Sequence, residues 1–250
     1  AHPDKIEVFD LESDMILYDI ATDSVIVVAN DPELLEVYPT WSPDGNYLYY
    51  CKSVPLPEEM RGQEIQTTYE KIQYNLYRRS FDAASLSFGD EELVYDAASK
   101  NKSATLPRIS PDGRYMLFPE GQYGCFHTRH GDADVMCVSL DGQFPIENDS
   151  VAGTSPFIDL TNFNSEGFAD TYPSWSSNGK WIMCSTRRGD GNYSRLYFSY
   201  FNNGKVEKAF MLPQEDPEQN TFRLKCYNRP EFMIEPVSIS VDEFSKVFDR

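Results

Sequence analysis

A motif that recurs three times along the chain is the feature that most constrains its fold. It reads Tyr-Pro-Thr-Trp-Ser-Pro-Asp-Gly from Tyr38, Leu-Pro-Arg-Ile-Ser-Pro-Asp-Gly from Leu106, and Tyr-Pro-Ser-Trp-Ser-Ser-Asn-Gly from Tyr172. The copies are spaced by 68 and 66 residues, and an apolar run closes each of them. Self-similarity at a nearly constant period indicates that one supersecondary unit is used in series.

The second half of the motif is typical of a tight turn between two strands. Proline presets φ at its position, aspartate tolerates the next one, and glycine takes the left-handed conformation that closes the turn. Large apolar residues flank the turn on both sides, as expected for a hairpin. The predicted hairpin turns are Pro43-Asp44, Pro111-Asp112 and Ser177-Asn178. We expect the turn aspartates to shape the turn and not to bind a ligand.

Two further extended segments follow each hairpin. The third strands are predicted at residues 74–81, 133–140 and 194–201, and the fourth strands at residues 92–95, 157–160 and 206–211. Four antiparallel strands repeated in series are the layout of β-propeller blades. The spacing exceeds the ~40–45 residues of an ordinary WD40 unit, because insertions lie at residues 54–72, 119–132 and 143–156. The sequence thus predicts an all-β fold, a β-propeller of four-stranded antiparallel blades, with about three complete blades at residues 36–96, 104–161 and 170–212.

The two ends of the chain do not form complete blades. Two short apolar segments within residues 14–30 match a third and a fourth strand, so we expect a partial blade there. Residues 213–250 fit no blade pattern and are interpreted as a C-terminal tail. Within this tail, residues 222–227 are compatible with an added strand and residues 241–248 with a short helix.

The last large apolar residue before each turn occupies an equivalent place in the repeat. These residues are Trp41, Ile109 and Trp175. Strands inside a propeller are buried on both faces, so we predict that all three side chains are buried between adjacent blades.

The Ser-Pro-Asp-Gly hairpin, followed by a strand that ends in aspartate, resembles the WD40-like (PD40) repeat of TolB and of the propellers in prolyl-oligopeptidase-type peptidases. The segments His130–Asp134, Ser174–Gly179 and Arg187–Arg195 resemble TolB-like proteins of the Bacteroidetes type, and the similarity spans about Asp14 to Leu212. TolB-like propellers have six blades, so the resemblance implies that this chain is the C-terminal half of a longer propeller. It also implies a periplasmic or cell-envelope location.

Charge and missing motifs argue against several classes of function. The chain carries 40 acidic and 22 basic residues, a net charge of −18, and such a field repels nucleic acid. No window approaches the ~18 consecutive apolar residues of a membrane span. There is no G-x-S-x-G nucleophile motif, P-loop or Rossmann fingerprint, so we expect no catalytic site and no cofactor. The five cysteines include no C-x-x-C pair, which argues against a zinc ribbon or a thioredoxin-type site.

Two groups of polar residues precede the third strands of the second and third blades. The binding-site candidates are His130, Asp132, Asp134, Arg187, Asp190 and Arg195. Radial repetition places equivalent loops on one face, so we expect the two groups to lie near one another. They serve either as ligand contacts or as an ion-pair network that holds the loops. His127 lies three residues before His130, but no standard zinc spacing is present, so we predict no metal site.

We interpret the chain as a non-enzymatic platform that binds another protein or an envelope component through its loops. The first alternative is the propeller domain of a prolyl-oligopeptidase-like hydrolase whose catalytic half lies outside these residues. The second is a carbohydrate-binding propeller, suggested by aromatic and acidic residues that blade packing explains better. The acidic insertion at residues 56–64 is interpreted as a lid, a partner contact or an exposed loop without a role.

Overall fold

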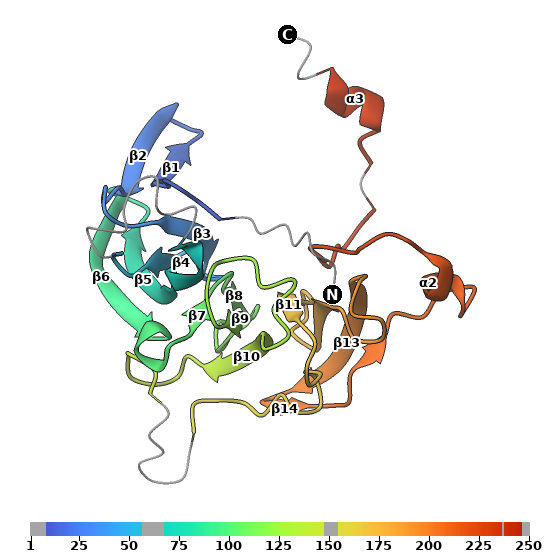
Figure 1. Ribbon diagram of the computed structural model, residues 1–250. Helices are drawn as coiled ribbons and strands as arrows, with labels where there is room; N and C mark the ends of the chain where they lie inside the picture. Colours follow the sequence, from blue (N-terminus) through green and yellow to red (C-terminus); the bar gives the residue numbers. More distant parts are fainter. Residues whose placement is uncertain (1–8, 57–67, 148–154, 237, 247–250) are drawn as a thin grey trace.

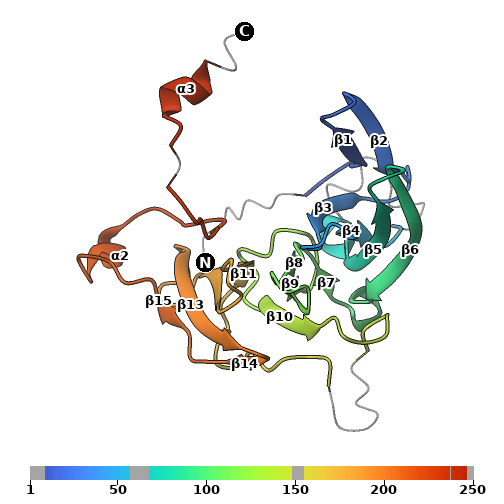
Figure 2. The same ribbon diagram turned by 180° about the vertical axis from the view of Figure 1, so that it is seen from behind.

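The computed structural model describes residues 9–56, 68–147, 155–236 and 238–246. Its strands form antiparallel sheets that stand side by side in an arc, as Figure 1 and, from behind, Figure 2 show. The fold is all-β and is a partial β-propeller, as the repeat predicts. In the described ranges no helix combines the length and the hydropathy that crossing a bilayer requires.

The first blade is the most regular of the sheets. Its strand order is β3-β4-β5-β6, and each neighbouring pair is antiparallel. The strands are β3 (Glu36–Trp41), β4 (Tyr47–Ser53), β5 (Tyr74–Asp82) and β6 (Ser87–Tyr95). Two 3-10 helices flank its outer half: η3 (Tyr69–Lys71) and η4 (Ala98–Lys100). The predicted third and fourth strands of this blade lie inside β5 and β6.

The second blade has a regular centre and an irregular outer edge. Its strands are β7 (Ser103–Ala104), β8 (Arg108–Ile109), β9 (Tyr115–Gly121) and β10 (Asp134–Ser139). The regular fourth strand predicted at residues 157–160 is wrong, because in the described residues an isolated bridge between Val138 and Phe157 takes its place. The side chain of Asp159 accepts the backbone N–H of Thr161 at 2.9 Å, and this local turn ends the pairing.

The third blade has the same order, with its outer strand in two pieces. Its strands are β11 (Asp170–Trp175), β12 (Trp181–Thr186), β13 (Arg195–Asn202), β14 (Lys205–Val206) and β15 (Phe210–Met211). Both β14 and β15 pair with β13, so the single strand predicted at residues 206–211 is divided. The chain leaves β13 between them, where the Ala209 N–H donates to the carbonyl of Asn162 at 2.9 Å.

Both ends of the described chain lie outside these blades (Figure 1). The additional elements are β1 (Met15–Asp19), β2 (Ser24–Ala29), α2 (Gln219–Phe222) and α3 (Val241–Ser245). β1 and β2 pair with each other and pack against the first blade. The added strand compatible with residues 222–227 is not formed. The carbonyls of Arg223 and Lys225 instead accept hydrogen bonds from the side chain of Arg195.

All three predicted hairpin turns are present and share one hydrogen-bond pattern. In the first turn, Ser42 Oγ donates to Asp44 at 2.6 Å and accepts the backbone N–H of Tyr47 at 2.9 Å. The glycine that follows, Gly45, has a φ of 73°, in the left-handed region. The same bonds recur in the other two turns, formed by Ser110 with Asp112 and by Ser176 with Asn178. A side-chain oxygen therefore shapes each turn, as predicted.

The core lies between the blades, where one sheet packs on the next. One apolar cluster joins the first blade to the second, and another joins the second to the third. Ile109 and Trp175 are half-buried in these clusters. The predicted burial of Trp41 is wrong, because 38% of this residue is exposed. On its side of the first blade the described residues provide the two-stranded sheet β1-β2, which leaves the indole partly uncovered.

Candidate functional site

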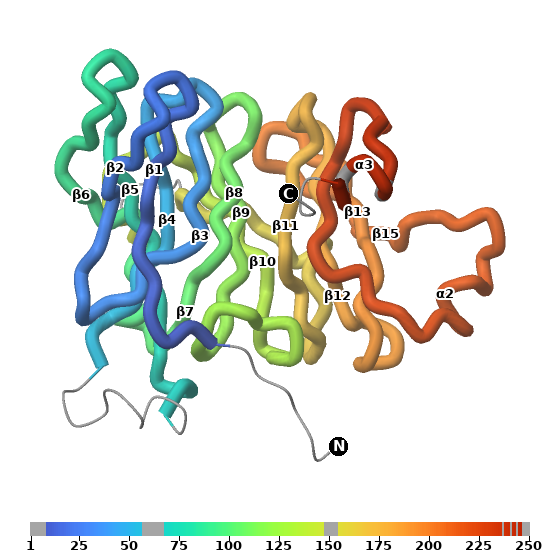
Figure 3. The backbone as a smooth tube through the Cα atoms, turned by 90° about the horizontal axis from the view of Figure 1, so that it is seen from above, coloured from blue at the N-terminus to red at the C-terminus, as the bar shows by residue number. Residues whose placement is uncertain are grey.

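The connections between second and third strands leave the blades at one end of the sheets. Residues 122–133 connect β9 to β10, and residues 187–194 connect β12 to β13. Residues 163–169 lead into β11 at the same end, and Figure 3 shows this edge of the molecule opposite the hairpin turns. We call the surface formed by these three segments the loop face. Residues 57–64 of the acidic insertion lie outside the described residues.

The two loops that carry the candidate residues contact each other. The guanidinium of Arg187 donates from Nε to the carbonyl of Thr128, in the neighbouring loop, and from Nη1 to that of Asn192, in its own loop. Where the third blade begins, the Asp170 N–H donates to the carbonyl of Ala133 at 2.8 Å. Both contacts end on backbone carbonyls. The second and third blades are therefore joined through the backbone of their loops.

The six candidate residues fall into an exposed set and a buried set. The exposed side chains are all acidic and belong to Asp132, Asp134 and Asp190. The buried side chains are the arginines and the histidine: Arg187, Arg195 and His130. Solvent and any partner therefore meet a more acidic surface than the composition of the six residues indicates.

Arg195 anchors the tail. Its guanidinium donates to four backbone carbonyls, at 2.8 Å for three of them and 3.2 Å for the fourth. The acceptors are Ser194, Asn220, Arg223 and Lys225. A guanidinium has five N–H donors, so most of its hydrogen-bonding capacity is used within the protein.

The three exposed aspartates differ in their surroundings. Asp190 accepts two backbone N–H groups of its own loop, at 2.8 and 2.9 Å, and so shapes that loop. A carboxylate oxygen of Asp132 lies 3.4 Å from Nζ of Lys102. Although Asp134 is exposed, loss of solvation where protein atoms surround its carboxyl group, followed by the nearby charge of Asp170, raises the pKa of Asp134 to about 6. Asp134 is thus ionised at neutral pH in a place where negative charge is unfavourable.

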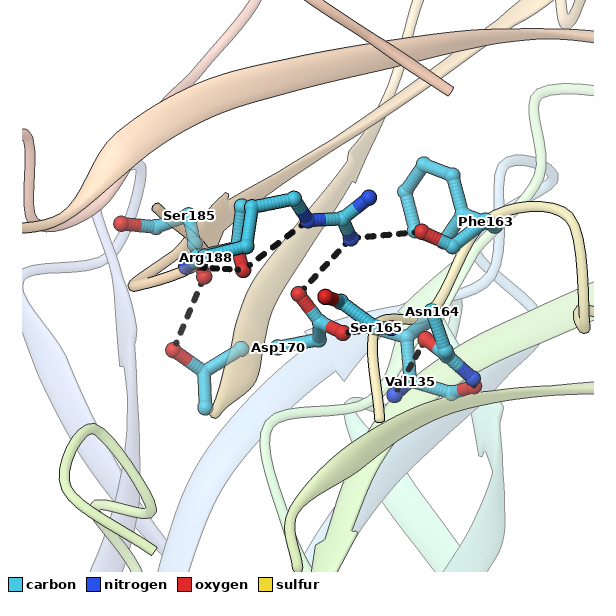
Figure 4. A network of polar contacts seen from close by, with 9 residues as sticks. Val135, Phe163, Asn164, Ser165, Asp170, Ser185 and Arg188 are labelled. Atoms are coloured by element: carbon cyan, nitrogen blue, oxygen red, sulfur yellow. Dashed lines mark hydrogen bonds and ion pairs between the residues drawn. The ribbon is translucent and has the colours of Figure 1, made fainter. Parts of the chain in front are cut away.

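The structure contains a buried ion pair under the loop face that the predicted site residues do not include. Nη2 of Arg188 lies 2.9 Å from the carboxylate of Asp170 and also donates to the carbonyl of Phe163 at 2.6 Å, as Figure 4 shows. The other carboxylate oxygen accepts the Ser165 N–H at 2.6 Å. Burial raises the pKa of Asp170, and the charge of Arg188 and the hydrogen bonds to the carboxylate act in the opposite direction. The sequence does contain a signal for this buried carboxylate. Asp170 lies two positions before the tyrosine that opens the third copy of the motif, and the first copy has an acidic residue, the buried Glu36, at the same position.

Two histidines pack inside the loop face. The ring centroids of His127 and His130 are 5.5 Å apart, and the ring of Tyr123 lies 4.5 Å from that of His130. Nε2 of His127 is 3.0 Å from the carbonyl of Gly124. Burial, followed by the charge of His130, lowers the pKa of His127 to about 4, so its ring is neutral at neutral pH. Within the described ranges, no three His, Cys, Asp or Glu side chains gather in a way that holds a metal ion.

Comparisons with known proteins return structural likenesses alone. No protein-family model and no curated protein matches this chain. An oligogalacturonate lyase in complex with manganese is 16% identical over 81% of this chain and 49% of its own, with a TM-score of 0.49. A putative TolB from Agrobacterium tumefaciens is 20% identical over 82% and 55%, with a TM-score of 0.44. The Cps50 (Swd1) β-propeller domain of Myceliophteria thermophila is 13% identical over 83% and 55%, with a TM-score of 0.43. The chain spans about half the length of each of these three proteins.

Proposed function

We propose that the chain is a non-enzymatic platform of the TolB-like type, which binds another protein or an envelope component through its loop face. A periplasmic or cell-envelope setting belongs to the same proposal. The observation that carries it is the division of the six candidate residues into three exposed aspartates and a buried set that contains Arg187 and Arg195. Binding surfaces commonly combine loops that present the contacts with a scaffold that holds those loops in place.

The buried arginines form the scaffold that holds the loops. Arg187 and Arg195 donate to backbone carbonyls of the loops and of the tail, so they fix the positions of neighbouring segments. A backbone held by several charge-assisted hydrogen bonds loses little further entropy when a partner binds. The loop face is therefore suited to recognition by a surface that is already formed.

The three exposed aspartates determine which kind of partner can bind. Asp134 is ionised at neutral pH although its surroundings raise its pKa to about 6, mainly through loss of solvation and then through Asp170. A lysine or arginine side chain from a partner would relieve this unfavourable charge, and Asp132 and Asp190 would extend the attraction. The proposed partner accordingly presents a basic patch to the loop face.

A charge-matched pair of variants tests the proposal. The loop-face variant carries Asp132→Asn, Asp134→Asn and Asp190→Asn, of which the last keeps a side-chain oxygen for the loop bonds. The control variant removes three exposed acids away from the loop face, through Asp90→Asn, Glu207→Gln and, in a hairpin turn, Asp112→Asn. Each protein is immobilised and used to capture partners from a cell-envelope extract, with thermal unfolding measured in parallel.

We expect the wild type and the control variant to retain the same partner, and the loop-face variant to lose it without a drop in thermal stability. Capture by the wild type should also weaken as salt is raised from low to physiological concentration, because rim charges are screened. Equal capture by the loop-face and control variants would refute the assignment to this face. Loss of the partner together with loss of stability would assign the three aspartates to the structure instead.

A further inference from the structure

The tail returns from α2 to the inner side of the arc. Arg195 holds the carbonyls of Arg223 and Lys225, which follow α2, and beyond them the Tyr227 N–H donates to the carbonyl of Ser194 at 3.1 Å. Oγ of Ser185 donates to the carbonyl of Tyr227. In Figure 3 this part of the tail runs beside β11. The bonds bring residues 228–232 close to the first strands of the second and third blades.

At this place one carboxylate is held by two blades. Glu231 forms an ion pair with Nη2 of Arg108, on β8, and accepts the hydroxyl of Ser174, on β11, at 3.3 Å. Arg108 and Ser174 occupy the same position of the repeat, directly after its first proline. In both copies the residue before that proline, Leu106 or Tyr172, has a φ of 50°. The shared backbone shape therefore presents equivalent side chains to one anion.

The surroundings of this carboxylate are built for negative charge. Nε1 of Trp175 donates to the carbonyl of Arg108 at 3.0 Å, which holds β8 and β11 together beneath the contact. Burial, and after it the charge of Arg229, lowers the pKa of Arg108, because a second guanidinium lies near the first. A partly buried guanidinium, with the positive charge of the exposed Arg229 nearby, favours a bound carboxylate, to which arginine makes strong charge-assisted hydrogen bonds.

Glu231 can leave this place without unfolding the tail. Its side chain is 48% exposed and that of Arg108 is 27% exposed. Ion pairs with this degree of exposure hold their partners weakly and exchange readily with competing charges. The tail is fixed independently, through Arg195 and Tyr227, so a turn of one side chain is enough to open the contact.

We propose that Arg108 and Ser174 form a binding site for a carboxylate of an acidic polypeptide segment, and that Glu231 occupies this site in cis until such a segment displaces it. The tail then acts as an intramolecular competitor. A tethered group of this kind has an effective concentration on the order of millimolar, so it excludes weak ligands and admits strong ones. The site lies on the inner strands, and its test is independent of the partner proposed for the loop face.

The test uses the full chain and a labelled peptide. The variant Glu231→Gln removes the competing charge, and Glu235→Gln, at an exposed position in the same tail, is the control with the same change in net charge. The probe is a peptide with the sequence of residues 228–233 and glutamine in place of its arginine, labelled with fluorescein at the N-terminus and amidated at the C-terminus, so that glutamate is its one charged side chain. Its binding is followed by fluorescence anisotropy. A second probe has glutamine in place of its glutamate. Circular dichroism of each variant verifies the fold.

We expect the probe to bind the Glu231→Gln variant at least tenfold more tightly than the wild type or the Glu235→Gln variant. The glutamine probe should bind that variant at least tenfold more weakly. Adding Arg108→Gln should abolish binding, whereas Arg108→Lys, which keeps the charge, should retain most of it. Equal binding to wild type and Glu231→Gln, no binding to Glu231→Gln at millimolar probe, or equal loss with Lys and Gln at position 108 would each overturn the proposal. The contact of Glu231 would then serve to fasten the tail alone.

Discussion

Replacing Trp175 with alanine tests the packing between the second and third blades. The indole packs edge-on against Phe201, with ring centroids 4.9 Å apart, inside the apolar cluster that joins the two blades. Truncating a large side chain at a packed site costs about 3–5 kcal/mol, and the low end applies to a half-buried indole. The lost hydrogen bond to the carbonyl of Arg108 adds about 1 kcal/mol. The expected loss in the free energy of unfolding is therefore about 4 kcal/mol.

The equivalent residue of the first blade supplies the matched comparison. Trp41 is 38% exposed and meets the rings of Phe81 and Phe88, at centroid distances of 5.1 and 6.3 Å. Aromatic contacts of this kind contribute about 0.5–1.5 kcal/mol each, so Trp41→Ala should cost about 1.5 kcal/mol. Trp175→Phe keeps an aromatic ring in the cluster and removes the indole N–H, and it should cost about 1 kcal/mol.

Urea unfolding followed by far-ultraviolet circular dichroism measures all three variants, with the free energy extrapolated linearly to water. For a chain of this size, each kcal/mol lowers the melting temperature by about 2–4 °C, so Trp175→Ala should melt about 8–16 °C below the wild type. A loss below about 1 kcal/mol for Trp175→Ala, or a loss no larger than that of Trp41→Ala, would refute the account of inter-blade packing given above.

Three further measurements test other parts of the structure. Gly113 has a φ of 74°, so Gly113→Ala should lower the free energy of unfolding by about 1 kcal/mol, whereas Gly142→Ala, at an open position without positive φ, should leave urea unfolding unchanged within error. The pKa of His127 is lowered to about 4 from 6.5, so the unfolded chain is protonated first as the pH falls. Stability should then drop by about 3 kcal/mol between about pH 6.5 and pH 4, and the His127→Gln variant, unfolded in urea at both pH values, should lack this contribution. Arg195→Lys cannot span the same carbonyls, so trypsin should cut the tail several-fold faster than in the wild type, whereas Arg114→Lys, at an exposed pair, should leave the cleavage rate unchanged.

The hairpins could be predicted because every bond that shapes them is local. Ser42, Asp44 and Gly45 close the first turn within a few residues, and the other two turns repeat those residue types or a close substitute. The outer strands could not be predicted to the same extent. The division between β14 and β15 depends on a bond between Ala209 and Asn162, which are far apart in the sequence. No pattern within residues 206–211 records that contact.

The loop face could be predicted in its position but not in its chemistry. Alternating strand directions place the second connection of each blade at the same end, which follows from strand order alone. The burial of Arg187 and Arg195 does not follow, because their acceptors are backbone carbonyls 59 and 25 residues away, at Thr128 and Asn220. A carbonyl is present at every residue, so the sequence carries no mark of the ones that are used.

The serine at the start of each turn has a consequence for how a chain of similar repeats folds correctly. Ser110 Oγ accepts the N–H of Tyr115 and donates to Asp112, so these side-chain bonds of the turn lie within residues 110–115 and need no contact with another blade. Closing so short a loop costs little entropy, and strands joined by such a turn find each other before more distant partners do. In a protein whose blades present similar strands, this priority guards against exchange of strands between blades. The side-chain bonds of the motif therefore protect the fidelity of strand pairing as well as the shape of the turn.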